Sequence, residues 1–268
     1  MTPEPQTWHY GLIADYWAEF NDDFRAFEIP YFRRHVERGG GPALDVACGT
    51  GRLLIPFLRA GLDVDGCDVS EDMVARCRDK AEREGFAPTL WAQPMHELDP
   101  PRRYRTIYVC GAFGLGSTRE QDADALRRFR ECLEPGGTLL LDTEVPYASD
   151  ANSWKWWQKR ERPELPRPWR EPDERERSLD GCEYALTSRL VDLDPLEQEL
   201  ALEIRAQRWR DGELEAEEAR ALTMRLYLKN ELVLMLQAAG FTDIEVQGDH
   251  NDAPATGEDD FLVFVTKS

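Results

Sequence analysis

Positive charge is scarce in this sequence. It has 33 lysine and arginine residues against 52 aspartate and glutamate residues, which gives a formal net charge of −19 and a pI near 4.7. Such a balance repels a phosphate backbone, because nucleic-acid binding depends on clustered positive charge. We therefore expect no nucleic-acid partner.

Long apolar runs are also absent. No apolar stretch approaches the roughly 18 residues that a membrane-spanning helix needs, and the amino terminus lacks the charged-then-apolar pattern of a secretion signal. The sequence thus predicts a cytoplasmic protein with no membrane partner. Because 41% of the residues are hydrophobic and 10% aromatic, there is enough material for one α/β core with an insertion.

Cys-x-x-Cys spacing is missing as well. The six cysteines lie at positions 48, 67, 77, 110, 132 and 182, and several fall in apparent core elements. Cysteines in such places are usually reduced, buried thiols. We therefore expect no metal site.

The most informative segment runs from Ala43 to Arg52, where a short apolar strand is followed by a glycine turn. The turn residues Gly49 and Gly51 allow a ligand to approach the backbone, and the amides at the next helix start attract a carboxylate or phosphate. A dinucleotide-binding motif would have a third glycine at position 54, where this chain has Leu54.

Asp45 precedes Gly49 by four residues, and this Asp-x-x-x-Gly-x-Gly order resembles motif I of the class I S-adenosylmethionine-dependent methyltransferases. The resemblance continues at Asp68, which ends a second predicted strand, and at Leu-Glu-Pro-Gly-Gly over 133–137. It implies that the turn meets the methionine end of S-adenosylmethionine, that Asp68 binds the ribose, and that Met73 lies beside the adenine. The cofactor-binding residues that it implies are Asp45, Ala47, Cys48, Gly49, Thr50, Gly51, Asp68, Val69, Met73, Gln93, Pro94, Met95 and Cys110.

The stretch after the third predicted strand departs from this family pattern. Many members carry an aspartate there that binds the adenine amino group, whereas this chain reads Gln93-Pro94-Met95-His96. We expect backbone groups or Gln93 to recognise the adenine instead.

The resemblance implies a Rossmann-like α/β fold, with a doubly wound, seven-stranded, mostly parallel sheet and helices on both faces. The helix expected after the fifth strand appears only at 231–239, where Asn230 would cap it. Residues 145–229 are therefore expected to be an insertion between two parts of the core, 1–144 and 230–268.

Alternating stretches in the insertion, at 183–193, 198–210 and 213–228, predict an antiparallel β meander. A similar insertion forms a lid in the glycine and aminosugar N-methyltransferases, and this chain is similar to that group. The first half of the insertion contains Trp154, Trp156, Trp157 and Trp169 among many charged residues. They are either a substrate gate or the apolar contacts of a solvated loop.

Methyl transfer needs little from side chains, since orientation and water exclusion supply most of the acceleration. A general base is required only if the nucleophile must lose a proton. Glu144, His96 and His250 follow predicted strands and are candidate bases, although each could equally be a solvated loop residue. Tyr16, on a helix predicted over 8–20, could face the transferred methyl group or simply pack.

These features predict S-adenosylmethionine-dependent methyl transfer to a nitrogen or oxygen of a small-molecule metabolite, by in-line displacement under a lid. A non-catalytic S-adenosylmethionine-binding protein is an alternative. A nucleotide-dependent oxidoreductase is a weaker one, because the third glycine is missing. The acceptor and a homodimeric state stay open.

Overall fold

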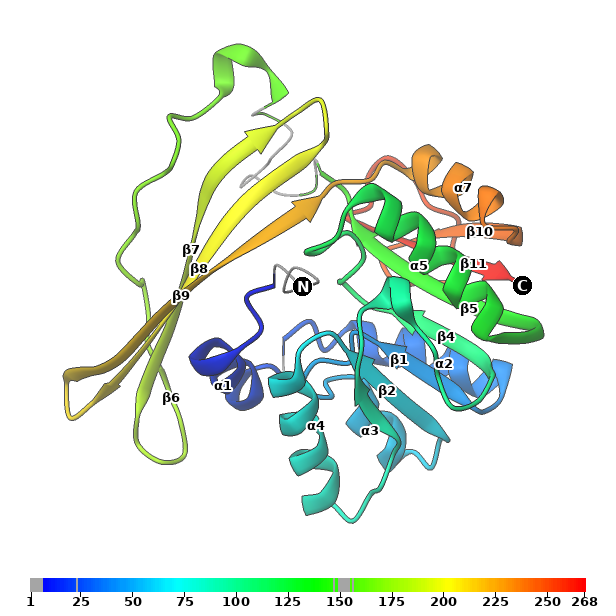
Figure 1. The fold of residues 1–268 in the computed structure, drawn as a ribbon, viewed down its shortest axis with the longest axis horizontal. Coiled ribbons are helices and arrows are strands. Elements are labelled where there is room, and N and C mark those ends of the chain that lie inside the picture. Colours follow the sequence, from blue (N-terminus) through cyan, green and yellow to red (C-terminus); the bar gives the residue numbers. More distant parts are fainter. Residues whose placement is uncertain (1–6, 23, 147, 149–154, 156) are drawn as a thin grey trace.

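The computed structural model describes residues 7–22, 24–146, 148, 155 and 157–268. It contains one large sheet between helices and a second sheet that stands beside it (Figure 1). The helices are α1 (Gly11–Phe20), α2 (Glu28–Gly39), α3 (Leu54–Arg59), α4 (Glu71–Arg83), η1 (Met95–Glu97), α5 (Arg119–Cys132), η2 (Lys159–Glu161) and α7 (Lys229–Ala238). The strands are β1 (Ala43–Val46), β2 (Val64–Asp68), β3 (Leu90–Ala92), β4 (Tyr104–Val109), β5 (Leu133–Glu144), β6 (Glu176–Arg177), β7 (Glu183–Asp194), β8 (Glu199–Arg210), β9 (Glu213–Arg225), β10 (Thr242–Gly248) and β11 (Phe261–Lys267).

The large sheet has seven strands in the order β10-β11-β5-β4-β1-β2-β3. Its first five strands in the chain run parallel, and β11 lies antiparallel between β5 and β10. One face packs against α5 and α7, and the other packs against α2, α3 and α4. The predicted Rossmann-like fold is confirmed.

The strand order reverses at β1, which pairs with β2 on one side and β4 on the other. A doubly wound sheet opens a crevice at the carboxyl ends of the strands that flank such a reversal. The glycine turn lies there, with Gly51 at φ +92° and a Cβ at this position only 2.9 Å from the Cys77 sulfur. Ser70 begins α4 as expected, since its hydroxyl accepts a hydrogen bond from the Met73 amide.

The second sheet is antiparallel, in the order β6-β7-β8-β9. Its three long strands confirm the predicted meander, and Asp211 and Gly212 join β8 to β9 with φ values of +52° and +83°. Helix α1 packs its Leu12 and Ile13 against this sheet, in a cluster that includes Ile204. The division into core and insertion at 145 and 229 stays a proposal.

Several predicted boundaries differ from the structure. Helix α7 begins at Lys229 after Leu228, so Asn230 is inside the helix and is not its cap. Strand β3 ends at Ala92, and the following residues turn into η1 because Pro94 precedes its first turn. Within the described part of the chain, no helix is both long enough and apolar enough to cross a bilayer.

Candidate active site

A cavity of about 560 Å³ lies between the carboxyl edge of the large sheet and the second sheet. We call it the main cavity. Its floor includes Asp45 and Cys110 at the ends of β1 and β4, and its roof includes Leu202 and Leu222 from β8 and β9. The volume lies within the range usual for small-molecule sites. An adjoining cavity of about 330 Å³ shares Ala47, among other residues, with the main cavity.

Most of the predicted cofactor residues meet at these two cavities. Those on the main cavity wall are Asp45, Ala47, Cys48, Gly49, Asp68, Val69, Met73, Met95 and Cys110. Gln93 and Pro94 line the adjoining cavity. Among the described residues, Thr50 and Gly51 do not line either cavity. Thr50 is fully buried under Trp17, and Gly51 packs on Cys77.

The Asp68 carboxylate is held by the backbone of two turns, one at Gly49 and one at Ser70. It accepts hydrogen bonds from the amides of Gly49, at 3.0 Å, and Ser70, at 2.8 Å. Burial raises the pKa of Asp68 to about 6, although these hydrogen bonds oppose the shift. Asp45 is more strongly affected, since burial raises its pKa to about 8.

The adjoining cavity holds the stretch that departs from the family pattern. The Gln93 side-chain oxygen already accepts hydrogen bonds from the Trp91 indole and the Asp99 amide, both at 3.0 Å. His96 lines this cavity, and its Nε2 lies 3.2 Å from the Gln121 amide nitrogen. The Gln93 side-chain oxygen is thus engaged with its own loop.

The four predicted catalytic residues are not brought together. Glu144 lines the main cavity, where its carboxylate lies 2.6 Å from an Arg25 guanidinium nitrogen. His96 faces the adjoining cavity. Tyr16 donates a hydrogen bond to Glu176 in a separate groove beside the second sheet, because its position on α1 turns it away from the main cavity.

His250 also differs from expectation, because it is buried behind the cavity wall. Its Nε2 lies 2.9 Å from Asp142 Oδ2, and both side chains are 1% exposed. Asp142 itself lines the main cavity and was not predicted. An acid at the end of the apolar run Leu139-Leu140-Leu141 was the signal that could have found it.

A second residue that the sequence did not reveal is His9, which lines the main cavity. Burial lowers the pKa of His9 to about 4, so its ring is neutral. The Trp8 indole donates to Nε2, at 3.0 Å, and Nδ1 lies 2.6 Å from the Thr7 hydroxyl. Since both ring nitrogens have partners, His9 is positioned as a wall residue and not as a base.

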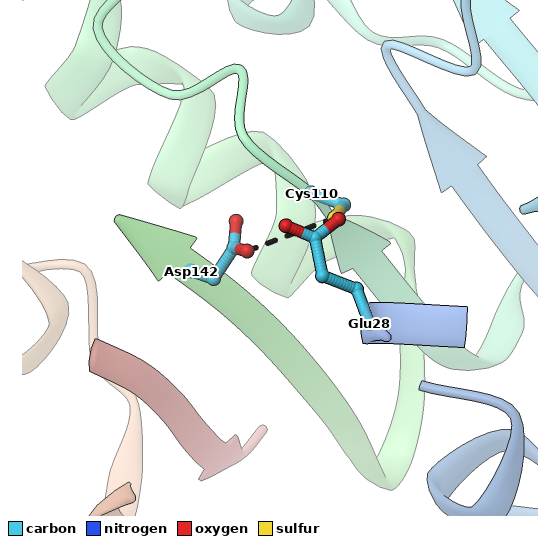
Figure 2. A group of neighbouring side chains, drawn as sticks. All are labelled: Glu28, Cys110 and Asp142. Atoms are coloured by element: carbon cyan, nitrogen blue, oxygen red, sulfur yellow. Dashed lines mark hydrogen bonds between the residues drawn. The ribbon is translucent and has the colours of Figure 1, made fainter. Parts of the chain in front are cut away.

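Glu28, Cys110 and Asp142 point toward one another at the ends of α2, β4 and β5 (Figure 2). One ligand atom from each lies within 4.8 Å of the others, as a metal site would require. Burial holds the pKa of the Cys110 thiol well above its usual range, and Arg52 lies 2.7 Å from Glu28. A protonated thiol beside a guanidinium is a poor cation site, so we assign no metal to this cluster.

The predicted tryptophan gate is only partly visible. Trp154 and Trp156 lie outside the described residues. Trp169 is stacked between the guanidinium groups of Arg189 and Arg205, at 4.6 and 4.8 Å from its ring centre. Strand alternation places Arg205 on the opposite face of β8 from Leu202, so Trp169 covers the outer face of the second sheet. Trp157 packs on a cluster that includes the main-cavity residues Leu200, Leu202 and Leu226.

Residues 43–137 match a family model described as a methyltransferase domain. The fold, the glycine turn and the cavity beside it agree with that match. Residues 43–137 therefore form a methyltransferase domain.

Among curated relatives, a dTDP-3-amino-3,4,6-trideoxy-alpha-D-glucopyranose N,N-dimethyltransferase of Streptomyces venezuelae is 32% identical over 135 residues, which cover 50% of this chain and 53% of that protein. A tRNA U34 carboxymethyltransferase of Azotobacter vinelandii is 33% identical over 139 residues, 51% of this chain and 41% of that one. The matches thus span about half the length of these relatives or less. A solved S-adenosylmethionine-dependent methyltransferase from Clostridium acetobutylicum has the same fold, with a TM-score of 0.70, 16% identity and coverage of 94% and 96% of the two chains.

Proposed function

We propose that this chain binds S-adenosylmethionine at the glycine turn and transfers its methyl group to a nitrogen or oxygen of a small molecule under the second sheet. One observation carries the proposal. The main cavity is bounded at once by motif residues such as Gly49 and by the apolar roof residues Leu202 and Leu222. A single space can therefore hold the cofactor and the acceptor side by side, which favours transfer by orientation.

The residues at the floor fit the cofactor's groups. The Gly49 backbone is open, since a Cβ there would meet only the Met73 methyl at 3.7 Å, and Asp45 offers a carboxyl group for an amino group. Asp68 retains lone pairs beyond its two backbone hydrogen bonds, which suits ribose hydroxyls. The bound cofactor would supply an electrophilic methyl group, and the chain would supply orientation.

A nitrogen acceptor is favoured over an oxygen acceptor. The Streptomyces relative is named as an N,N-dimethyltransferase, and an amine can attack as its free base without a strong general base. The tRNA named for the other relative is a poor fit here, because a net charge of −19 repels its backbone. We further propose that the protein is cytoplasmic and has no membrane partner.

Two experiments test the proposal. Calorimetric titration should show S-adenosylmethionine binding, and incubation with methyl-labelled cofactor and a panel of amines, sugars and phenols should transfer label. Binding without transfer across the panel would favour a non-catalytic cofactor-binding protein. Retention of a nicotinamide dinucleotide by the purified protein, with no affinity for S-adenosylmethionine, would favour the oxidoreductase.

A further inference from the structure

Four carboxyl groups line the main cavity, and three of them already have a partner or a reason to be neutral. Asp68 accepts two backbone hydrogen bonds. Glu144 is paired with Arg25 at 2.6 Å. Asp45 is kept largely protonated at neutral pH by burial, which raises its pKa to about 8. The fourth, Asp142, has no ion pair with an arginine or lysine among the described residues, although it is 1% exposed.

His250 orients Asp142 but does not supply the missing positive charge. Its Nε2 donates to Asp142 Oδ2 at 2.9 Å, while its Nδ1 is buried and has no hydrogen-bond partner. A protonated ring would bury an unsatisfied N–H at Nδ1, which is costly. The ring is held by an edge contact to Tyr31 and a tilted contact to Phe261.

The other oxygen of Asp142 is held from the backbone, because the Gly111 amide donates to Oδ1. The carboxylate thus sits at the end of β5 in a fixed orientation. The Cys110 thiol also donates to Oδ2, at 3.6 Å. A carboxylate can accept about four hydrogen bonds, so one acceptor position remains on this lining residue of the cavity. A buried negative charge with a spare acceptor position favours a cationic ligand.

The opposite wall of the main cavity is mostly apolar. Its side chains include Leu200 and Leu202 from β8, which face Met224 and Leu222 across the β8–β9 ladder. Phe113 extends the same apolar surface. Arg225 also lines this wall; its Nη2 pairs with Glu199, and its Nη1 is buried without a hydrogen-bond partner among the described residues. A ligand between the two walls meets a carboxylate on one side and aliphatic surface on the other.

We propose that Asp142 binds the amino group of the methyl acceptor, with His250 as its positioning residue, and that the leucine wall binds an apolar group attached to that nitrogen. The acceptor class is then a hydrophobic primary or secondary amine. This inference rests on the proposed function and names the substrate class of the same site. Asp142 is the residue placed to contact the acceptor.

Asp142 also accepts the proton that the acceptor nitrogen must lose. The acceptor enters as an ammonium ion, and one N–H proton moves to an Asp142 oxygen as the N–H bond breaks. The freed nitrogen lone pair forms the N–C bond to the methyl carbon while the C–S bond breaks and its electron pair stays on sulfur. The product leaves as a methylated ammonium ion, and Asp142 then returns its proton to water.

The test uses protein saturated with S-adenosylhomocysteine at pH 7.5 and calorimetric titration with three probes. Cyclohexylmethylamine has both the amine and the apolar group, cyclohexylmethanol lacks the amine, and D-glucosamine lacks the apolar group. We expect the first to bind at least about tenfold more tightly than either of the others. Asp142→Asn should remove the preference for the amine over the alcohol, His250→Asn should reduce it about threefold, and the surface control Glu37→Gln should preserve it.

Equal binding of the amine and the alcohol to the wild type would overturn the proposal, and so would an amine preference that survives Asp142→Asn. If Asp142→Asn fails to fold, as judged by its S-adenosylhomocysteine affinity, the comparison of probes on the wild type decides alone. Failure of the proposed function is distinguishable, because it would appear as a lack of S-adenosylhomocysteine binding or as cofactor binding without label transfer across the panel.

Discussion

The floor and the roof of the main cavity are built in different ways. The floor takes its groups from consecutive turns at the ends of neighbouring parallel strands, as at Gly49 and Asp68, which lie close in sequence. The roof takes aliphatic side chains from alternate positions of antiparallel strands, as at Leu202 and Leu222. The floor can therefore bind one fixed ligand through its backbone. The roof can select an acceptor by the shape and polarity of its side chains, and those side chains can differ between proteins with different acceptors.

Replacing the insertion should give the largest difference between the loss of turnover and the loss of cofactor affinity. If residues 145–229 are exchanged for a short Gly/Ser linker, we expect turnover to fall at least about a thousandfold, because orientation and water exclusion are lost. The affinity for S-adenosylmethionine should change less than about tenfold. Calorimetry and label transfer measure the two quantities, and an equal loss of both would show that the insertion is needed for the fold of the floor.

Asp68→Ala tests the floor alone. We expect S-adenosylmethionine affinity to fall by about 1.5–3 kcal/mol, or roughly ten- to a hundredfold, because hydrogen bonds to a charged group are lost. Calorimetric titration checks this, with Asp79→Ala on the exposed side of α4 as the matched control. Unchanged affinity in a folded Asp68→Ala protein would contradict the ribose assignment.

The floor should also respond to pH. Burial raises the pKa of Asp45 to about 8 and that of Asp68 to about 6, so both are more protonated in the free protein than ordinary carboxyl groups. A cationic amino group favours the ionised form of Asp45, so binding releases a proton and affinity rises with pH. We expect a gain of about tenfold from pH 5.5 to 7.5. Asp45→Asn should flatten this rise, and a persistent slope in that variant would exclude Asp45 as its source.

The smallest effects are expected from the three predicted bases. Glu144→Gln, His96→Asn and His250→Asn should each keep activity within about tenfold of the wild type, because none of these side chains is the proposed proton acceptor and His250 only positions Asp142. Initial rates of label transfer measure this. A loss of about a thousandfold in one variant, with cofactor affinity intact, would identify an essential base and favour oxygen as the acceptor.

Most residues of the floor were predictable from the sequence. For the roof, the sequence predicted the strands but not the side chains that face the cavity. The glycine turn, Asp68 and the Ser70 cap depend on local backbone chemistry, which neighbouring residues specify. The β meander was predictable from alternation, but alternation does not say which face meets the core. That choice depends on how α1 packs through Ile13, a contact distant in sequence.

The sequence did not reveal Asp142, and it named His250 without predicting its burial. Asp142 ends an apolar run that indicated core, and it reaches the cavity wall because β5 continues past the last β4 pair, Val109 with Leu141. His250 follows β10 as expected, yet it is buried because the 248–261 segment folds back over β11 with Asp249 bonded to the Phe261 backbone. Such contacts between distant segments are fixed by tertiary packing, which sequence periodicity does not describe.

We propose that one cavity has a floor that binds the cofactor and a roof that binds the acceptor. The effect of Leu202→Trp on label transfer and on cofactor affinity tests this most directly. The larger side chain fills the roof without touching the glycine turn, so label transfer should fall at least about a hundredfold while the S-adenosylmethionine dissociation constant stays within about threefold of the wild type. Loss of cofactor affinity in proportion to activity, or unchanged transfer, would contradict the division of the cavity into these two parts.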